Sequence, residues 1–496
     1  MNLYIYETES SAVIVDCGVM FGDEYIPAVD VILPDFTYIQ TIRHKLKGLL
    51  ATHGHEDHIG GISRLLSLID IPVYTGKFTR ELLSIKAKKY IANLNLIIPF
   101  NEYDFGDIKT VFFPVRHSIP DTCGVALEIE GKRLVHMSDF ASLDIPDFLK
   151  EAGIFLLMLD STNSIRAEEG GVSDEYYHVN TESDVAAVLA DIIKNAPGKV
   201  FFTTFASNVE RLKSVIEASE ACGRKTVIVG AAMEKTMGIT SRLGLITKLD
   251  DRLIGIKPAM EYPPEKLVYI LSGCQGEYNS ALYSVIKGER KNVMMDGGDT
   301  LILSSRVIPG NERWINNIVN KSIKEGITVI QSADRLVHVS GHAAEQELER
   351  VILELNPRHF IPIHGEYRHM KACAAIAEQH GSAIHILESG TLLEFSDNGV
   401  SRSTFPNNPI FIDNYGEPFE KGVLDELKHI SKEGAVIITK RGRRYFAKAV
   451  GVMLSKAVIN GLCTVLGSLK SGESRILHAK KYIKKKSGHK PLVVEI

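Results

Sequence analysis

The chain has 496 residues, 45% of them hydrophobic and 24% charged, and its formal net charge is −4. A chain of this length with an ordinary globular composition is predicted to fold into two or three domains with substantial cores. The near balance of charges excludes a basic surface over the whole protein, so any surface for a nucleic acid must be local.

Three features predict a cytoplasmic protein without a membrane span. The six cysteines lie far apart and form no C-x-x-C pair, which is typical of reduced thiols rather than a disulfide framework. The first ten residues lack the basic stretch and cleavage site of an export signal. The longest mostly apolar stretch, 449–469, is interrupted by Lys456 and Asn460, which favours a buried segment over a membrane span.

Five short apolar runs in the first third of the chain each lead to a residue with a metal-binding side chain. The runs cover 11–15, 49–52, 111–116, 133–138 and 154–159. They end at Asp16, His53, His117, Asp139 and Asp160. Such runs predict buried strands, and strands that deliver these residues at their ends place a site along one edge of a sheet.

The densest cluster of candidate ligands is the segment 53–58, His-Gly-His-Glu-Asp-His. It lies between the run 49–52 and a helical pattern from Leu65 to Ile69, which predicts a strand-to-helix loop. Imidazole and carboxylate groups are the ligands expected for zinc or manganese. A solvated, His-rich loop is the alternative interpretation, but four potential ligands at this spacing favour a metal site.

After Asp160 the pattern changes to strands that alternate with helices. Residues 181–184, Thr-Glu-Ser-Asp, form a capping box that opens an amphipathic helix, and Pro197-Gly198 ends it. Strands are predicted at 200–204, 226–229, 267–271, 292–295 and 327–330. This alternation predicts a parallel sheet in an inserted domain over 179–333.

The pattern of the metal domain resumes after residue 333. A helix with apolar residues from Leu348 to Leu355 ends at Asn356-Pro357, and the strand 360–363 ends at His364. Residues 401–419 are predicted to be a linker, and 420–496 a small α/β domain. The basic run from Arg475 to Lys490 is either a solvated face or a surface for the phosphates of a single-stranded nucleic acid, which next to a nuclease would be RNA.

These motifs resemble the metallo-β-lactamase superfamily and, within it, the β-CASP nucleases of the ribonuclease J family. Besides the segment 53–58, the resemblance is carried by 338–342 (His-Val-Ser-Gly-His), 361–369, 205–209, 272–277 and 308–312. It implies an α/β fold: a metallo-β-lactamase αββα sandwich with an inserted α/β β-CASP domain and a small C-terminal α/β domain. The implied boundaries are 1–178 and 334–400 for the sandwich, 179–333 for the insertion, and 420–496 for the last domain. The family's Gly-rich strand and loop before Met1-Asn2-Leu3 is missing here, which we expect to weaken the first sheet.

The resemblance also implies two divalent metal ions, with zinc the expected metal and manganese or magnesium the alternatives. His53, His55 and His117 would hold one ion, and Asp57, His58 and His364 the other. Asp139 would bridge both, and Asp57 is also counted as catalytic. Asp16 would orient the metal loop, with a plain strand-end aspartate as the alternative.

Further residues are implied to act on the substrate. Asp160 would orient His342, which would donate a proton to the leaving oxygen; the alternative is a pair of polar residues that cap a strand and a helix. The turn 338–342 would bind the 5′-monophosphate of RNA through His338, Ser340, Gly341 and His342, at the start of a helix that begins near His342. Ser207 and Asn208 would add contacts, unless they form an ordinary turn.

The implied function is that of a cytoplasmic ribonuclease on single-stranded RNA, which trims 5′-monophosphate ends in the 5′-to-3′ direction and also cleaves internally, in RNA maturation and mRNA decay. Homo-oligomers, dimeric or tetrameric, are expected. The alternatives are a β-CASP nuclease on DNA, a small-molecule hydrolase, and a non-catalytic partner subunit of an RNA degradation complex. The insertion argues against the small-molecule hydrolase, and the complete ligand set argues against the non-catalytic subunit.

Overall fold

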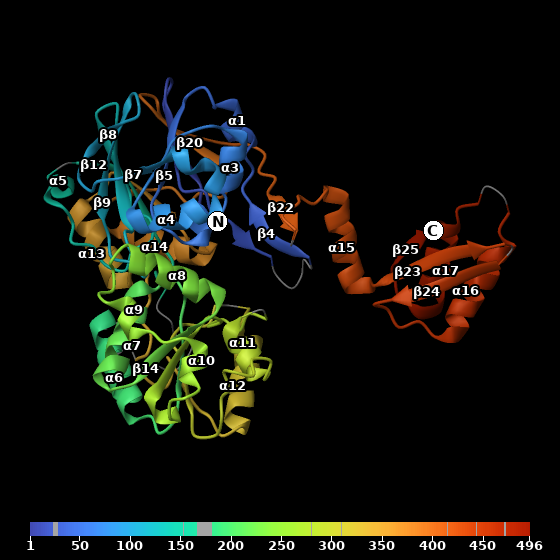
Figure 1. Cartoon of the computed structure of the whole chain (residues 1–496). Coiled ribbons are helices and arrows are strands. Elements are labelled where there is room, and N and C mark those ends of the chain that lie inside the picture. The colour runs from blue at the N-terminus through green and yellow to red at the C-terminus, as the bar shows by residue number, and fades with distance from the viewer. Residues whose placement is uncertain are drawn as a thin grey trace. The chain divides into compact units, whose positions relative to one another are not determined.

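The computed structural model describes residues 1–22, 28–151, 153–165, 181–278, 280–308, 310–413, 415–442, 444–470 and 473–496. The chain forms two compact units (Figure 1). The larger unit comprises 2–18 and 36–405, and the smaller comprises Met1, 19–35 and 406–496.

Two sheets face each other in the metal domain of the larger unit. The first has the order β1 (Tyr4–Glu7), β2 (Ala12–Val15), β5 (Leu46–Ala51), β6 (Val73–Thr75), β7 (Leu94–Leu96). The second has the order β19 (Ala383–Ile384), β18 (His359–Ile363), β12 (Ile154–Asp160), β11 (Lys132–His136), β10 (Cys123–Ile129), β9 (Ile108–Pro114), β8 (Glu102–Asp104). Side chains of both sheets meet in one buried cluster, which includes Val13, Leu50, Phe112, Val125 and Met158. Two sheets packed in this way make the centre of a sandwich.

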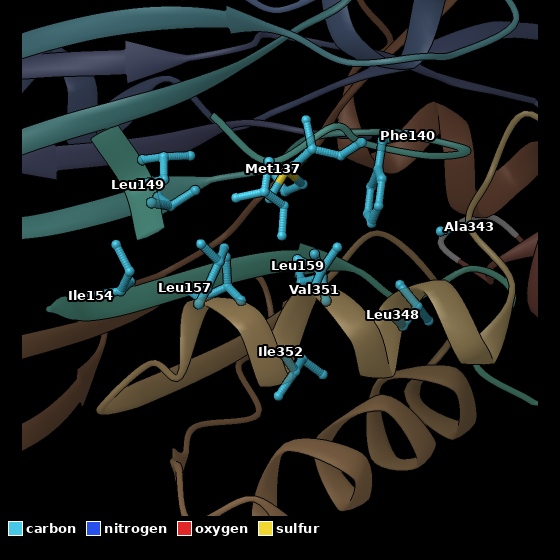
Figure 2. Close-up of a cluster of buried hydrophobic side chains, with 14 of the residues drawn as sticks. Met137, Phe140, Leu149, Ile154, Leu157, Leu159, Ala343, Leu348, Val351 and Ile352 are labelled. Carbon is cyan, nitrogen blue, oxygen red and sulfur yellow. The ribbon is translucent and has the colours of Figure 1, made fainter. Parts of the chain in front are cut away.

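Helices cover the outer faces of the sandwich. α1 (Thr37–Thr41), α3 (Ile62–Leu68) and α4 (Lys77–Lys86) lie along the first sheet, and α5 (Asp147–Lys150), α13 (Glu345–Leu355) and α14 (Tyr367–Gln379) along the second (Figure 1). α13 buries the face predicted from its sequence: Leu348 and Val351 lie toward β12, which carries Leu157 and Leu159, and Ile352 lies on the other side of the helix within the same buried cluster (Figure 2). The layers are therefore those of the expected αββα sandwich.

The inserted domain contains a parallel sheet, as the sequence predicts. Its order is β14 (Lys225–Val229), β15 (Leu267–Leu271), β13 (Val200–Thr203), β16 (Thr300–Leu303), β17 (Thr328–Gln331). The sheet is flanked by α6 (Glu182–Asn195), α7 (Val209–Ala221), α8 (Ala231–Arg242), α9 (Leu249–Arg252), α10 (Ile256–Ala259), α11 (Ala281–Ile286) and α12 (Glu312–Lys324). The capping box at Thr181 and Asp184 is present and starts α6.

One predicted strand, 292–295, is wrong, because β16 lies later in the chain. The Val293 amide donates to the Arg290 carbonyl, and the Asp299 carboxylate accepts from the backbone of Asp296 and Lys199. These bonds place turns at both ends of 290–299 and use the Val293 amide, which a strand would need for its neighbour.

The smaller unit contains two three-stranded sheets. β22 (Ile410–Asp413), which lies inside the predicted linker, pairs with β4 (Val29–Leu33), and β4 pairs with β3 (Met20–Phe21). After α15 (Lys421–Glu433), the second sheet has the order β24 (Arg444–Val450), β23 (Ala435–Arg441), β25 (Leu492–Glu495), with α16 (Lys456–Ser468) and α17 (Arg475–Ser487). A hairpin of β20 (Thr391–Ser396) and β21 (Gly399–Thr404) belongs to the larger unit. No described helix is both long enough and apolar enough to cross a bilayer.

Leu348→Ala should lower the free energy of unfolding by about 2–4 kcal/mol, because it opens a cavity in a closed core. Leu348 is 1% exposed, whereas Leu353 on the same helix is 52% exposed. Leu353→Ala is therefore the control and should change stability by less than about 0.5 kcal/mol. Urea unfolding of both variants with the metal chelated measures the difference; equal midpoints would contradict this packing.

Candidate active site

Strands of both sheets deliver acidic and imidazole side chains to one place. β2 leads into Asp16, β12 ends at Asp160 and β18 leads into His364. The backbone is left-handed at Asp16 (φ 59°) and at His364 (φ 48°), which non-glycine residues rarely adopt. Such conformations cost about 1–3 kcal/mol each and collect at functional sites, so these turns are built to aim a side chain.

Three histidines point their ring nitrogens at one point. The Nδ1 atom of His55 lies 3.0 Å from Nε2 of His53 and 3.1 Å from Nε2 of His117. With a carboxylate oxygen of Asp139, these atoms all lie within 4.8 Å of one another. Burial lowers the pKa of His55 to about 4 and that of His117 to about 3, so the rings are neutral as metal ligands must be.

In each of the three rings, the nitrogen that faces away from the candidate metal position has a hydrogen-bond partner. These partners orient the other nitrogen, with its lone pair, toward the metal position. The His117 Nδ1–H donates to the Gly341 carbonyl at 2.6 Å, which leaves Nε2 as the acceptor. A side chain at Gly341 would come within 3.0 Å of this ring, so glycine permits the contact. The Nδ1 of His53 meets the Thr52 hydroxyl at 3.0 Å, and the Nε2 of His55 meets Ser207 Oγ at 3.0 Å. Partners of this kind fix ring orientation and tautomer in metal sites.

A second group of four ligand-type residues shares Asp139 with the first. Nε2 of His364 lies 3.1 Å from Asp57 Oδ2, and Nε2 of His58 lies 3.3 Å from Asp139 Oδ2. Burial alone would lower the pKa of His58, but the carboxylates of Asp139, Asp57 and Asp16 raise it to about 10. The other oxygen of Asp139 is buried without a hydrogen-bond partner among the described residues. A divalent cation would satisfy this oxygen and the local negative charge, so the residues fit a two-metal site.

Asp16 is a buried support of the second group. Its carboxylate accepts from the Thr52 amide at 2.8 Å and from the His58 Nδ1–H at 2.7 Å. Thr52 also donates its hydroxyl to Asp16. The carboxylate thus joins the residue before His53 to the ring of His58, which favours the orienting role over a plain strand-end aspartate.

Asp160 and His342 form a close pair beside the two groups. The Nδ1–H of His342 donates to Asp160 Oδ2 at 2.7 Å, and Thr162 donates its amide and hydroxyl to Oδ1. Burial lowers the pKa of His342, but the Asp160 carboxylate outweighs burial and holds the pKa above its usual value. Asp139, Asp160, His342 and His364 also meet the distance limit of a metal group. His342 therefore lies within reach of the metal groups as well as of Asp160.

The turn 338–342 lies farther from a helix start than the sequence predicts. α13 begins at Glu345 rather than near His342, and its first residues follow an extended Ala344. The Asn163 amide explains the irregular turn, since it donates to Ser340 Oγ at 2.8 Å and to the His342 carbonyl at 2.9 Å. The turn is thus held by a side chain rather than by helical hydrogen bonds.

Arg211 is the main residue that sequence reasoning missed. It is 0% exposed, and it binds Glu182, the Ser304 carbonyl and Nδ1 of His338, the last at 2.6 Å. Because a guanidinium only donates, His338 Nδ1 must accept, and burial with Arg211 lowers the pKa of His338 to about 3. His338 is therefore a neutral ring with its proton on Nε2. Arg211 shares the buried stripe of α7 with Val215 and Ser219, and this spacing was the available signal.

Asn208, a predicted contact, and Gln275, in the segment 272–277 of the family resemblance, both make bonds within the inserted domain. The Asn208 side chain accepts from the Arg211 amide and caps α7, which is the ordinary-turn alternative. Gln275 of the segment 272–277 donates to the Arg306 carbonyl at 2.8 Å and accepts from the Ile308 amide at 2.8 Å. That segment therefore supports the loop after β16.

Three family models match the chain in succession. Residues 2–201 match the metallo-beta-lactamase superfamily, and 197–322 match the beta-CASP domain of ribonuclease J. Residues 327–387 match the Zn-dependent metallo-hydrolase RNA specificity domain. The last match contains His338, His342 and His364. The site residues from the C-terminal half of the metal domain thus lie in the segment that matches the RNA specificity domain.

Curated relatives are similar over most of the chain. Ribonuclease J of Mycoplasma pneumoniae is 32% identical, with 88% of this chain and 79% of that protein covered. Ribonuclease J of Thermus thermophilus is 31% identical, with 100% of this chain and 92% of that protein covered. Ribonuclease J2 of Bacillus subtilis is 32% identical, with 88% and 80% covered. A solved protein of unknown function from Enterococcus faecalis V583 shares the fold, with a TM-score of 0.54, 15% identity, and 81% of this chain and 96% of that chain covered.

Asp16→Asn should weaken metal binding by about 10- to 100-fold, because the Thr52 amide and the His58 Nδ1–H bind different oxygens of Asp16, and asparagine replaces one of these oxygens by an NH₂ donor. Asp107→Asn is the control, since Asp107 binds the exposed hydroxyls of Thr8 and Ser10. Isothermal titration calorimetry measures the zinc affinity of each variant after its metal has been removed with a chelator. Wild-type affinity in Asp16→Asn would return Asp16 to a plain strand-end residue.

Proposed function

We propose that this chain, which belongs to the ribonuclease J family, trims single-stranded RNA from 5′-monophosphate ends in the 5′-to-3′ direction and also cleaves RNA internally. The chain is a β-CASP metallo-hydrolase and a metal-dependent ribonuclease. The 5′-end preference, the two modes of cleavage and the residue roles below form the proposal.

One observation carries the proposal: the turn 338–342 is tied to both sides of the site. Its Gly341 carbonyl accepts from the ligand-type residue His117, and its His338 ring accepts from Arg211 of the inserted domain. A terminal phosphate bound by His338 and Ser340 would thus lie at a fixed reach from the metal groups. A constant distance from the bound 5′-phosphate to the metal ions supports removal of one nucleotide at a time.

His338 would recognise the phosphate as a neutral donor. The proton on Nε2 and the hydroxyl of Ser340 offer hydrogen bonds rather than a full charge, and Arg211 keeps the ring from turning. Neutral donors of this kind suit a single phosphate, and we expect them to bind the longer triphosphate less well.

His342 would supply the proton for the leaving oxygen. Its Nδ1–H is held by Asp160 at 2.7 Å, which stabilises the protonated ring and fixes its direction. His53, His55, His117 and Asp139 would hold one ion, and Asp57, His58, His364 and Asp139 the other. Bound divalent ions supply positive charge beside the phosphate and lower the pKa of water.

The remaining parts of the proposal concern the metal, the assembly and the place of action. Zinc is the metal we propose, because the ligand groups are rich in imidazole, with manganese or magnesium as alternatives. We also propose a homo-oligomer, a dimer or a tetramer, that works in the cytoplasm in RNA maturation and mRNA decay. The domain boundaries given from the sequence stay predictions. The relatives favour RNA over DNA as the substrate.

Three RNAs of one sequence with 5′-monophosphate, 5′-triphosphate and 5′-hydroxyl ends test the pocket. The metal-loaded protein should trim the monophosphate fastest, and His338→Gln should bring its rate close to that of the hydroxyl end. Initial rates of nucleotide release measure this. Equal wild-type rates on the three ends would refute the pocket, whereas trimming of the DNA of the same sequence at the RNA rate would refute the choice of substrate.

Variants of His342 and His55 separate proton transfer from metal binding. His342→Ala should retain both metals while cleavage falls by ~10² to 10⁴-fold, the usual effect of a positioned general acid. His55→Ala should lose metal and activity together. Asp160→Asn should resemble a milder His342→Ala. Metal content by mass spectrometry beside the cleavage rate decides the point: a metal-depleted His342→Ala would make His342 a ligand.

A further inference from the structure

The last sheet of the chain has two different faces. α16 and α17 cover one face, where Val436, Ile438, Leu462, Ile483 and Val493 form a closed core (Figure 1). The edge strand β24 alternates strictly: Tyr445, Ala447 and Ala449 pack against this core, whereas Arg444, Phe446, Lys448 and Val450 are exposed. The alternation assigns the exposed residues to the opposite face.

Strand register places the neighbours of these exposed residues. Phe446 lies opposite Thr439, Lys448 opposite Ile437, and Arg444 opposite Arg441. Ile437 in turn lies opposite Val494 of β25. We call the residues Ile437, Thr439, Arg441, Arg444, Phe446, Lys448, Val450 and Val494 the open face.

The composition of the open face is unusual for a surface that meets only water. A solvated sheet face normally carries polar residues at alternate positions, yet Phe446 is 49% exposed, Val450 46% and Val494 41%. Apolar side chains gathered in this way mark a binding surface.

The charges of the open face are all positive. Its three cations, Arg441, Arg444 and Lys448, form no ion pair with another described residue, and the face contains no acidic side chain. On the helix-covered face, by contrast, Arg475 pairs with Glu495 and lies over the Tyr445 ring. The cations of the open face are thus available to a partner.

We propose that the open face binds single-stranded RNA, with Phe446 as a stacking platform for a base and Arg441, Arg444 and Lys448 as phosphate contacts. This rests on the chain being a ribonuclease. A base-sized aromatic surface among unpaired cations is the combination that holds single strands without sequence preference. A second copy of the chain fits less well, because a two-fold contact between open faces would bring like charges together.

The face lies on a different part of the domain from the basic helix α17. Ala479 and Ile483 turn α17 toward the core, and Lys484, Lys485 and Lys486 follow in its last turn. α15 meets the sheet at the start of β25, where His429 and Glu433 bond the backbone of Lys490. The end of the open face with Arg444 and Phe446 is at the other end of β23, beside the hairpin turn.

The test measures binding of a 3′-labelled oligouridine of about 20 nucleotides, with phosphorothioate linkages that block trimming, to the full metal-loaded chain. Phe446→Ala should weaken binding by about 5- to 30-fold, as expected for the loss of one stacked base. Arg444→Gln with Lys448→Gln should make the salt slope shallower by about 1.4 units, by the single-strand counterion rule. Ultraviolet crosslinks should map to the peptide that contains Phe446.

The controls change the same chemistry elsewhere in the domain. Met453→Ala removes an apolar side chain that is 93% exposed, and Lys456→Gln with Lys470→Gln removes two exposed cations. Neither should change the affinity. All variants should hydrolyse bis(p-nitrophenyl) phosphate at the wild-type rate, which separates this proposal from the catalytic one.

Three results would overturn the proposal. The first is wild-type affinity in both open-face variants. The second is loss of oligomers in Phe446→Ala at unchanged RNA affinity, which would assign the face to a second copy. The third is a loss of RNA binding in Lys484→Gln/Lys485→Gln/Lys486→Gln with crosslinks on α17 alone.

Discussion

Buried negative charge is the constraint around which the larger unit is built. Asp16, Asp139 and Asp160 are almost fully buried, and each lies at or just beyond the end of a strand. A buried carboxylate is stable only when hydrogen bonds and positive charge surround it. The imidazole rings of His58, His342 and His364 are their nearest partners, and they come from parts of the chain separated by the whole inserted domain. Chain segments far apart in sequence are thus held together at one electrostatic centre.

A second buried charge anchors the inserted domain. Arg211 and Glu182 form an ion pair whose guanidinium is inaccessible to water, and the spare donors of Arg211 go to Ser304, Val339 and His338. Such a pair adds little net stability compared with apolar packing, because two charges must be desolvated. It does dictate geometry, since every donor of a buried guanidinium needs an acceptor at a set angle. The buried ion pair therefore contributes little to the free energy of unfolding, but it fixes the orientation of the His338 ring.

Features that depend on short stretches of sequence were predictable. The capping box at Thr181 and Asp184, the apolar face of α13, and the ligand-rich segment 53–58 each express local chemistry, and the structure contains all three. The strand expected at 292–295 is absent because the Val293 amide is used in a turn with Arg290, and Asp299 closes another turn at Asp296. Asn163 and Arg211 escaped notice for a related reason: Asn163 bonds Ser340, 177 residues later, and Arg211 bonds His338, 127 residues later.

The contact between Ser207 and His55 joins the inserted domain to a candidate metal ligand. Ser207 Oγ meets the outer nitrogen of His55 at 3.0 Å, and the inner nitrogen of the same ring faces His53 and His117. Free energies of linked events are reciprocal: if this bond strengthens metal binding, then metal binding strengthens the bond by an equal amount. Metal occupancy and the position of the inserted domain would then be linked through this one hydrogen bond. A substrate that displaced Ser207 from His55 would weaken metal binding to the same extent.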